Sequence, residues 1–146
     1  MASTYTATVE KLRAGISSNY RDDIVVTYAI TAAANGSVTD IGTDDDSSNG
    51  VTVSQYILGK RLNAVEAFPT VGGVAPDAAD ITVKQNGLDI LGGNGINLIH
   101  ATDTKSTYPM IDGFPALYPI RSELTIGVAN QVTNAAQFTI KMTFAL

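Results

Sequence analysis

The ten C-terminal residues, QFTIKMTFAL, constrain the fold more than any other part of the sequence. Apolar side chains alternate here with small or polar ones, and the apolar series is Phe138, Ile140, Met142, Phe144 and Leu146. A period of two places such a series on one face of a β-strand. Because the alternation continues to Leu146, we expect this strand to be paired inside a sheet and not to form a loose tail.

Other segments show the same alternation. Leu124–Ala129 is predicted to form an antiparallel hairpin with the C-terminal strand through a loop at 130–136. A second hairpin is predicted at Asn86-Gly87, because these residues tolerate the positive φ of a tight turn; a simple strand-end turn is the alternative. The segments TYTATVEKL and DIVVTYAIT predict two further strands. Residues 1–11 are either an edge strand or an N-terminal arm that pairs with a neighbouring chain.

The middle of the sequence is less regular. Two short strands are predicted to flank the acidic loop within SVTDIGTDDDSSNGVTVS, and PTVGGVAPDAAD is predicted to be a loop. YILGKRLNAVEAF fits either a helix or a strand, and Gly59 and the β-rich surroundings favour a strand. One short helix is compatible with residues 95–101. The pattern predicts an all-β fold, a single-domain β-sandwich or jelly roll over residues 1–146 with a few long loops and at most one short helix.

Composition narrows the function classes. A chain of 146 residues with 45% hydrophobic content can bury one core. Charged residues make up 16%, below the roughly 25% of ordinary domains, and the net charge of −5 argues against a nucleic-acid partner. The absence of cysteine excludes disulfides, thiolate metal sites and cysteine nucleophiles. No apolar run approaches the roughly 18 residues of a membrane span, and the N-terminus does not resemble a signal peptide, so we expect synthesis and action in a cytoplasm without secretion through a standard signal.

The glycine-rich stretch DILGGNGINLIH raises the question of a phosphate-binding turn. A dinucleotide fingerprint requires a third glycine, and Leu98 stands where it should be after Gly93-Asn94-Gly95. No Gly-Lys-Ser/Thr follows, so the alternative nucleotide motif fails as well. The stretch is therefore predicted to be a sharp turn after a strand at Leu88–Leu91.

The acidic loop offers oxygen ligands to a hard cation such as Ca²⁺. Asp40 and Asp44–Asp46 are close in sequence, and alternate positions from Asp44 resemble a calcium-binding loop. The pattern fails where such loops need glycine and glutamate, because Asn49 and Gln55 occupy those positions. A solvated loop is predicted, and no metal ligand is assigned.

No other pattern defines an enzyme. His100 is the one histidine, it has no G-x-S-x-G partner, and it is interpreted as a polar residue at the end of an apolar segment. Tryptophan is absent and aromatic residues make up 7%, which leaves little to stack a sugar in a hydrolase site. We therefore assign no catalytic, cofactor-binding or metal-binding residue and expect no enzymatic activity. The tyrosines are interpreted as core or interface residues: Tyr20, Tyr28, Tyr56, Tyr108 and Tyr118.

The segment YPMIDGFPALYPI combines three prolines with many apolar side chains. The prolines are expected to prevent regular ladders, yet the segment is too apolar for an ordinary exposed loop. It either folds back over one end of the sandwich or docks on a neighbouring subunit.

Over residues 56–146 the order of segments resembles a group of small virion structural proteins of tailed bacteriophages. The resemblance rests on YILGKRLNAVEAF, APDAADITV, NGLDILGGNG, PMIDGFPALYPI, and the closing ELTIGVAN and QFTIKMTFAL. It implies a capsid decoration (cement) protein, a homotrimer on the capsid surface of the virion that binds the major capsid protein and is made in the host cytoplasm. It implies no nucleic-acid or membrane partner, no cofactor and no site residue, and residues 1–55 match no pattern.

Two alternatives stay open. Another virion component, such as a tail or portal-proximal structural protein, would have the same β-rich composition. A carbohydrate- or receptor-binding β-sandwich module would require an exposed aromatic or carboxylate cluster at a loop end, for which the sequence offers only the Asp44–Asp46 loop and the tyrosines.

Overall fold

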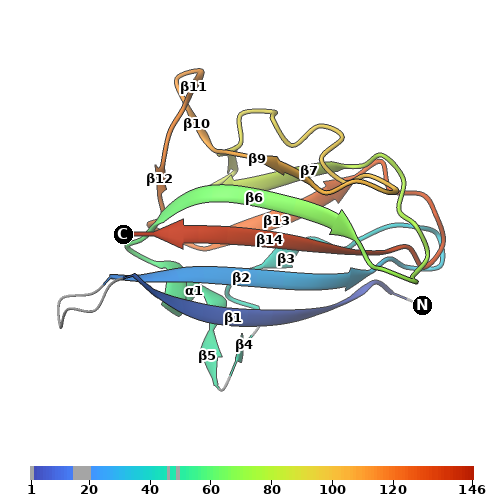
Figure 1. The fold of residues 1–146 in the computed structure, drawn as a ribbon, viewed down its shortest axis with the longest axis horizontal. Coiled ribbons are helices and arrows are strands. Elements are labelled where there is room, and N and C mark those ends of the chain that lie inside the picture. Colours follow the sequence, from blue (N-terminus) through green and yellow to red (C-terminus); the bar gives the residue numbers. More distant parts are fainter. Residues whose placement is uncertain (1, 15–20, 46, 49) are drawn as a thin grey trace.

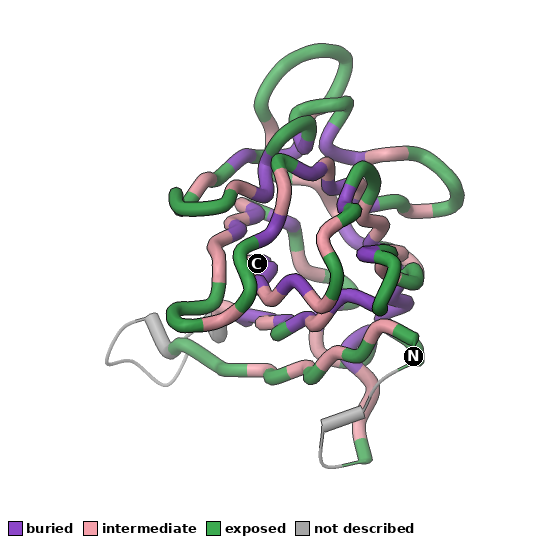
Figure 2. Tube along the Cα trace, turned by 90° about the vertical axis from the view of Figure 1, so that its right-hand side faces the viewer, coloured by how far each residue is buried: buried purple, intermediate pink, exposed green. Residues whose placement is uncertain are grey.

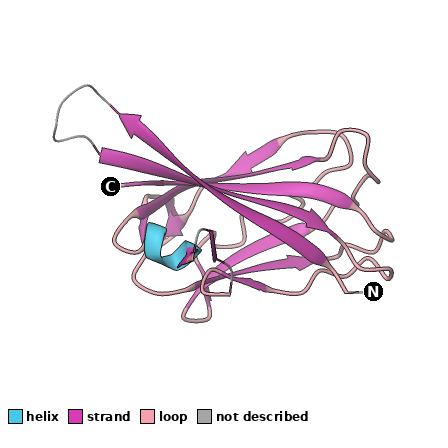
Figure 3. Cartoon of the chain, turned by 90° about the horizontal axis from the view of Figure 1, so that it is seen from below, coloured by secondary structure: helices cyan, strands magenta, loops and turns pink. Residues whose placement is uncertain are grey.

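The computed structural model of the chain describes residues 2–14, 21–45, 47–48 and 50–146. Two antiparallel sheets pack face to face, and the hydrophobic core lies between them (Figure 3). The described residues contain one short helix, so the all-β fold expected from the sequence is confirmed. The more specific jelly-roll topology stays a prediction.

The larger sheet has the strand order β1-β2-β14-β6, and the short strands β9 and β12 both pair with β6 (Figure 1). Its strands are β1 (Thr4–Ala14), β2 (Arg21–Thr31), β14 (Gln137–Ala145), β6 (Arg61–Pro69), β9 (Lys105–Thr107) and β12 (Tyr118–Pro119). β14 lies between β2 and β6, and its four inward side chains, Phe138, Ile140, Met142 and Phe144, are fully buried. The C-terminal alternation therefore specifies the central strand of this sheet.

The smaller sheet has the order β3-β13-β7-β8. Its strands are β3 (Ile41–Gly42), β13 (Leu124–Ala129), β7 (Asp80–Gln85) and β8 (Leu88–Asp89). β7 and β8 form the hairpin predicted at Asn86-Gly87, and the φ angles of these two residues are 51° and 81°. Two successive positive φ angles are the signature of the tight turn that asparagine and glycine favour.

The hairpin predicted between Leu124–Ala129 and the C-terminal strand is wrong. β13 pairs with β3 and β7, whereas β14 pairs with β2 and β6 in the opposite sheet. Residues 130–136 carry the chain from one sheet to the other. Both strands bury one face against the same core, and a period of two does not show which sheet holds which strand.

The helix also lies elsewhere than expected. α1 (Val53–Ile57) is the helix, while residues 95–101 form turns and bends. The side chain of Gln55 accepts a hydrogen bond from the Thr52 amide at 3.0 Å, which satisfies a free donor at the helix start. Gly59, with φ +82°, then redirects the chain into β6. The stretch predicted as one strand from residue 56 is therefore divided between the end of a helix and a strand.

Residues 4–14 form β1 at the edge of the larger sheet. The strand pairs with β2 over its whole length, from Thr4 opposite Thr31 to Ala14 opposite Arg21. Its inner face carries Tyr5, whose ring meets the buried Tyr28 ring edge-on at 5.9 Å. In the described residues the other edge of β1 has no ladder partner, so pairing with a neighbouring chain stays a prediction.

Two short hairpins complete the described structure. One consists of β4 (Ser47–Ser48) and β5 (Val51–Thr52), and it lies below β1 in Figure 1. The other consists of β10 (Met110–Ile111) and β11 (Phe114–Pro115). The expectation that prolines keep this segment out of regular ladders is therefore wrong: Asp112 and Gly113, at φ 50° and 81°, form a second tight turn, and Pro115 lies at the end of the ladder.

Candidate interaction surface

The glycine-rich turn after β8 is occupied by a carboxylate of the chain itself. Asp89 accepts hydrogen bonds from the amides of Val83 and Leu91 at 3.2 Å each through Oδ1, and from Gly93 at 3.0 Å through Oδ2. Such clustered amides are what an anion would bind. Because Asp89 already uses three of them, the turn has a structural role, as the sequence pattern predicted.

Two further aspartates hold loops together. Asp77 accepts hydrogen bonds through Oδ2 from the amides of Val132 and Thr133, at 2.8 and 2.7 Å, and from the Gln131 side chain, while its Oδ1 accepts from the Thr133 hydroxyl at 2.8 Å. These bonds lower the pKa of Asp77, with the Val132 amide as the largest cause. Asp80 accepts from the Asn97 amide and the Asn130 side chain. The sequence pattern predicts a loop here, and it contains no signal for the role of these carboxylates.

The predicted ligand and catalytic candidates are not brought together. In the described part of the chain, no group of three or more histidine, cysteine, aspartate or glutamate side chains is arranged to hold a metal ion. Asp46 and Asn49 of the acidic loop lie outside the described residues. His100 closes a local turn, since its Nδ1 accepts from the amides of Thr102 and Asp103 at 3.3 and 3.1 Å.

The tyrosines occupy different environments. Tyr28 is buried in the core, Tyr56 is half-buried with the Lys11 ammonium 5.6 Å from its ring centre, and Tyr118 is half-buried on β12. Tyr108 is exposed on the surface. Tyr20 lies outside the described residues. The structure thus places Tyr28 in the core and exposes Tyr108 at the start of the proline-rich segment.

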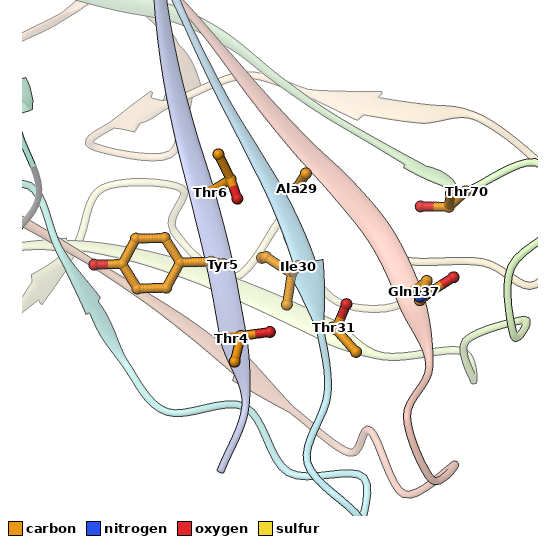
Figure 4. A pocket seen from close by; sticks show the side chains of 8 residues that line it. All are labelled: Thr4, Tyr5, Thr6, Ala29, Ile30, Thr31, Thr70 and Gln137. Carbon is orange, nitrogen blue, oxygen red and sulfur yellow. The ribbon is translucent and has the colours of Figure 1, made fainter. Parts of the chain in front are cut away.

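The outer face of the larger sheet is rich in threonine, and its charged residues include Glu10, Glu66 and Lys141. One cross-strand row consists of Thr6, Ala29, Thr139 and Phe68, and the next contains Lys141 opposite Glu66. A shallow hollow of about 280 Å³ lies at one end of this face, with Thr4, Thr6, Thr31, Thr70 and Gln137 in its lining (Figure 4). Its lining includes no carboxylate, histidine or cationic side chain, so it offers hydrogen bonds but no acid–base chemistry.

The β10–β11 hairpin is the most distinctive surface feature. Its base is anchored to the sandwich, because the Met110 amide donates to the Ile90 carbonyl at 2.9 Å and the Ile120 amide donates to the Lys60 carbonyl at 2.8 Å. Pro109 and Ile120 are buried at the two ends of the segment. The segment is expected either to fold back over one end of the sandwich or to dock on a neighbouring subunit. Only its base folds back onto the sandwich.

The tip of the hairpin projects from the body. It forms the top of the molecule in Figure 1, and the same region is drawn as exposed in Figure 2. Phe114 is 73% exposed, and Ile111 and Leu117 are exposed as well. Leu88, 59% exposed in the β7–β8 hairpin, is a further large apolar side chain on this surface. Apolar side chains gathered in this way are typical of a protein interaction site.

A depression runs along the base of this hairpin, and we call it the hairpin groove. Its larger part, about 350 Å³, includes Leu88, Gly92, Met110, Ile111 and Tyr118 in its lining. Its smaller part, about 250 Å³, is lined by Gln85, Ile111, Tyr118, Pro119 and Arg121. The two parts share Ile111 and Tyr118. The groove therefore combines apolar side chains with the carboxylates of Asp89 and Asp112 in its larger part and the Arg121 side chain in its smaller part.

Comparison with models of known protein families, with curated proteins and with solved structures finds no match to this chain. In the described residues no helix is long enough to cross a membrane.

Proposed function

We propose that this chain is a virion structural protein: a capsid decoration (cement) protein that binds the outside of a phage head as a homotrimer. The observation that carries the proposal is the β10–β11 hairpin, which is anchored at its base and exposes Phe114 at its tip. The order of segments over residues 56–146 resembles that of tailed-phage virion proteins. This resemblance is the reason for proposing a phage head as the place where the chain acts.

The mechanism of such a protein is mechanical. Packaged DNA pushes capsid subunits apart, and an added protein that bridges subunits opposes this by burying surface that exists only in the assembled, expanded shell. The threonine-rich rows of the outer sheet face suit packing against the major capsid protein, because an uncharged hydroxyl costs less to desolvate than a charged group. No chemical step is required of any residue.

A carbohydrate- or receptor-binding module is the second candidate, and Tyr108 favours it. This half-exposed ring lines a hollow of about 260 Å³ together with Asn63 and Leu117. An aromatic face beside an amide can stack on a sugar ring and hydrogen-bond to its hydroxyls. A position in the tail or near the portal is a variant of the first proposal that differs in copy number.

The number of copies per virion tests these functions. We would purify virions of the phage that encodes the chain and quantify it against the major capsid protein by mass spectrometry. A decoration protein should be present in numbers comparable to the major capsid protein, whereas a tail or portal component should be far scarcer. Absence from virions, together with binding on a glycan array that Tyr108→Ala abolishes, would replace the proposal by the carbohydrate-binding function.

A further inference from the structure

We propose that Asn86-Gly87 is a self-modification site, at which the backbone amide of Gly87 attacks the Asn86 side chain and converts it to aspartate or isoaspartate. The sequence contains four Asn-Gly pairs, at 35–36, 49–50, 86–87 and 94–95, and the structure describes both residues of three of them. Glycine favours such an attack because it has no Cβ to restrict its backbone. The inference goes beyond the proposed function and does not depend on it.

The reaction needs only hydroxide and water besides the chain itself. Hydroxide removes the proton of the Gly87 amide, and the nitrogen then forms a bond to the Asn86 Cγ. The tetrahedral intermediate expels ammonia and leaves a five-membered succinimide that contains the Gly87 nitrogen. Water adds to either carbonyl of this ring and opens it, which gives aspartate or isoaspartate. Ring closure requires rotation about the Asn86 Cα–C bond, so the glycine must be able to move.

Gly87 has room for this movement. Asn86 and Gly87 are both exposed in the turn between β7 and β8. Apart from the chain neighbours of Gly87, no atom lies within 4 Å of a Cβ built on this residue. Among the described residues, the Gly87 amide has no hydrogen-bond acceptor. Hydroxide can therefore reach the amide proton, and the glycine can rotate without displacing a packed neighbour.

The pair at 35–36 is protected by its glycine. Gly36 is buried, its amide donates to the Ala33 carbonyl at 2.9 Å, and a Cβ at this position would collide with the Val132 backbone. The Asn35 Oδ1 accepts hydrogen bonds from the Ser37 amide and hydroxyl at 3.0 and 2.7 Å. Ring closure here would require the Gly36 amide to give up its partner and the loop to open.

The pair at 94–95 is protected by packing. Gly95 is buried, and a Cβ at this position would collide with the Ile81 carbonyl oxygen. The Gly95 carbonyl accepts hydrogen bonds from the amides of Ile81 and Leu98 at 2.9 and 3.2 Å. These contacts fix the glycine against β7, so rotation of the Asn94 backbone would break them. Of the three described pairs, Asn86-Gly87 alone combines an exposed glycine with open space around it.

Ser122 assists the attack at Asn86. Its hydroxyl donates a hydrogen bond to the Asn86 Oδ1 at 3.3 Å. This oxygen gains negative charge when the Gly87 nitrogen bonds to Cγ, and a hydrogen-bond donor already directed at it stabilises the transition state. Gln85 holds the hydroxyl in place, because its Oε1 accepts from the amides of Arg121 and Ser122 at 2.8 and 3.3 Å. The turn thus contains both an accessible nucleophile and a group that activates its target.

The products change the surface beside the hairpin groove. Aspartate adds a negative charge to the turn. Isoaspartate inserts a further carbon atom into the backbone of a two-residue turn whose ladder pairs Gln85 with Leu88. Because turn length fixes the register of a hairpin, isoaspartate should displace Leu88, which lines the groove and is 59% exposed. The modified form accumulates with the age of the chain.

Incubation of the full chain in mildly alkaline buffer, native and in guanidinium chloride, tests the site. Tandem mass spectrometry of its peptides measures the reaction at each asparagine. In the native chain Asn86 should react at least about tenfold faster than Asn35 and Asn94, whose loops must open first. In denaturant the three rates should be similar. Equal native rates at the three sites, or a faster reaction of Asn86 that persists in denaturant, would overturn the inference.

Ser122→Ala and Ser122→Thr test the assisting hydroxyl. In the native chain, Ser122→Ala should slow the reaction of Asn86 about fivefold, the factor expected for the loss of one net hydrogen bond. Ser122→Thr retains a hydroxyl and should react at the wild-type rate, and neither variant should differ from wild type in denaturant. A hydroxyl that only holds the turn would leave the native rate of Ser122→Ala unchanged or raise it, and either result would contradict the assistance by Ser122.

Discussion

Among single residues, aspartates hold the loops at the ends of the sandwich. Asp77, Asp80 and Asp89 each accept hydrogen bonds from backbone amides. The Asp77 carboxylate joins the loop before β7 to residues 131–133, which are more than fifty positions away in the sequence. A loop amide shielded from water needs such a partner. These side chains therefore satisfy the loop amides with hydrogen bonds, as the backbone ladders satisfy the amides of the strands.

Asp77 should make stability depend on pH. Its pKa is lowered in the folded chain, so the stability that it contributes is present above its ordinary value of 3.8 and is lost as the pH falls through the lower, folded value. Asp77→Asn should reduce the free energy of unfolding at pH 7, and its deficit relative to wild type should shrink on acidification below pH 3.8. Urea unfolding at pH 7 and at pH 3 measures this. Asp44→Asn, at an exposed position, is the control, and an unchanged deficit at both pH values would contradict the role.

Gly95 is required for a different reason than the other glycines of its turn. A Cβ here would lie 1.8 Å from the Ile81 carbonyl oxygen, whereas a Cβ on Gly93 would meet open space and only a strained φ of +85°. We expect Gly95→Ala to destabilise by about 3 kcal/mol through overpacking and Gly93→Ala by about 1 kcal/mol through backbone strain. Thermal and urea unfolding of both variants measure the difference. Equal losses would show that the close approach at Gly95 relaxes easily.

Among the elements, β14 determines the register of the larger sheet. Its Phe144 is fully buried, whereas the neighbouring Thr143 lies on the outer face. Phe144→Ala should cost about 3–5 kcal/mol of unfolding free energy and Thr143→Ala no more than about 0.5 kcal/mol. Chemical denaturation of the two variants measures both values. Because a one-residue slip would exchange the two faces, similar losses would contradict this register.

The elements also show how far sequence reasoning reaches. Alternation identified β2 and β14, and Asn86-Gly87 identified a turn, because these signals are local. The partner of β13 is set by how two sheets share one core, and alternation contains no such information. The β10–β11 hairpin has a local signal in Asp112-Gly113. The prolines of the segment argue against a ladder, but Pro115 lies at the ladder's end and does not prevent it. The anchored base of the hairpin and the loop contacts of Asp77 depend on residues distant in sequence, so they could not be predicted.

In the whole molecule, the exposed hairpin and the threonine-rich outer face of the larger sheet belong to different parts of the surface. The hairpin extends beyond the top of the sheets in Figure 1. The outer face spans β1, β2, β14 and β6. A protein that bridges shell subunits needs both kinds of surface, one for its own copies and one for the shell. This division allows the two contacts to be varied separately.

Separate surfaces predict that loss of the proposed trimer would weaken attachment to the shell without removing it. Three identical contacts held in one trimer gain avidity, which commonly strengthens binding by a factor of about 10² to 10⁴ over a single contact. Phe114→Ser removes the exposed apolar side chain of the hairpin on which the proposed association depends. The variant should therefore still bind expanded heads that lack the protein, but with an affinity lower by a factor of this order, and it should raise the temperature of DNA release less than wild type does. Sedimentation with such heads and a dye assay for released DNA measure the two effects. Val71→Ser, at a fully exposed apolar position in the loop after β6, is the control. Equal binding by wild type and Phe114→Ser would show that each copy attaches independently and that the trimer is not the unit that holds the shell together.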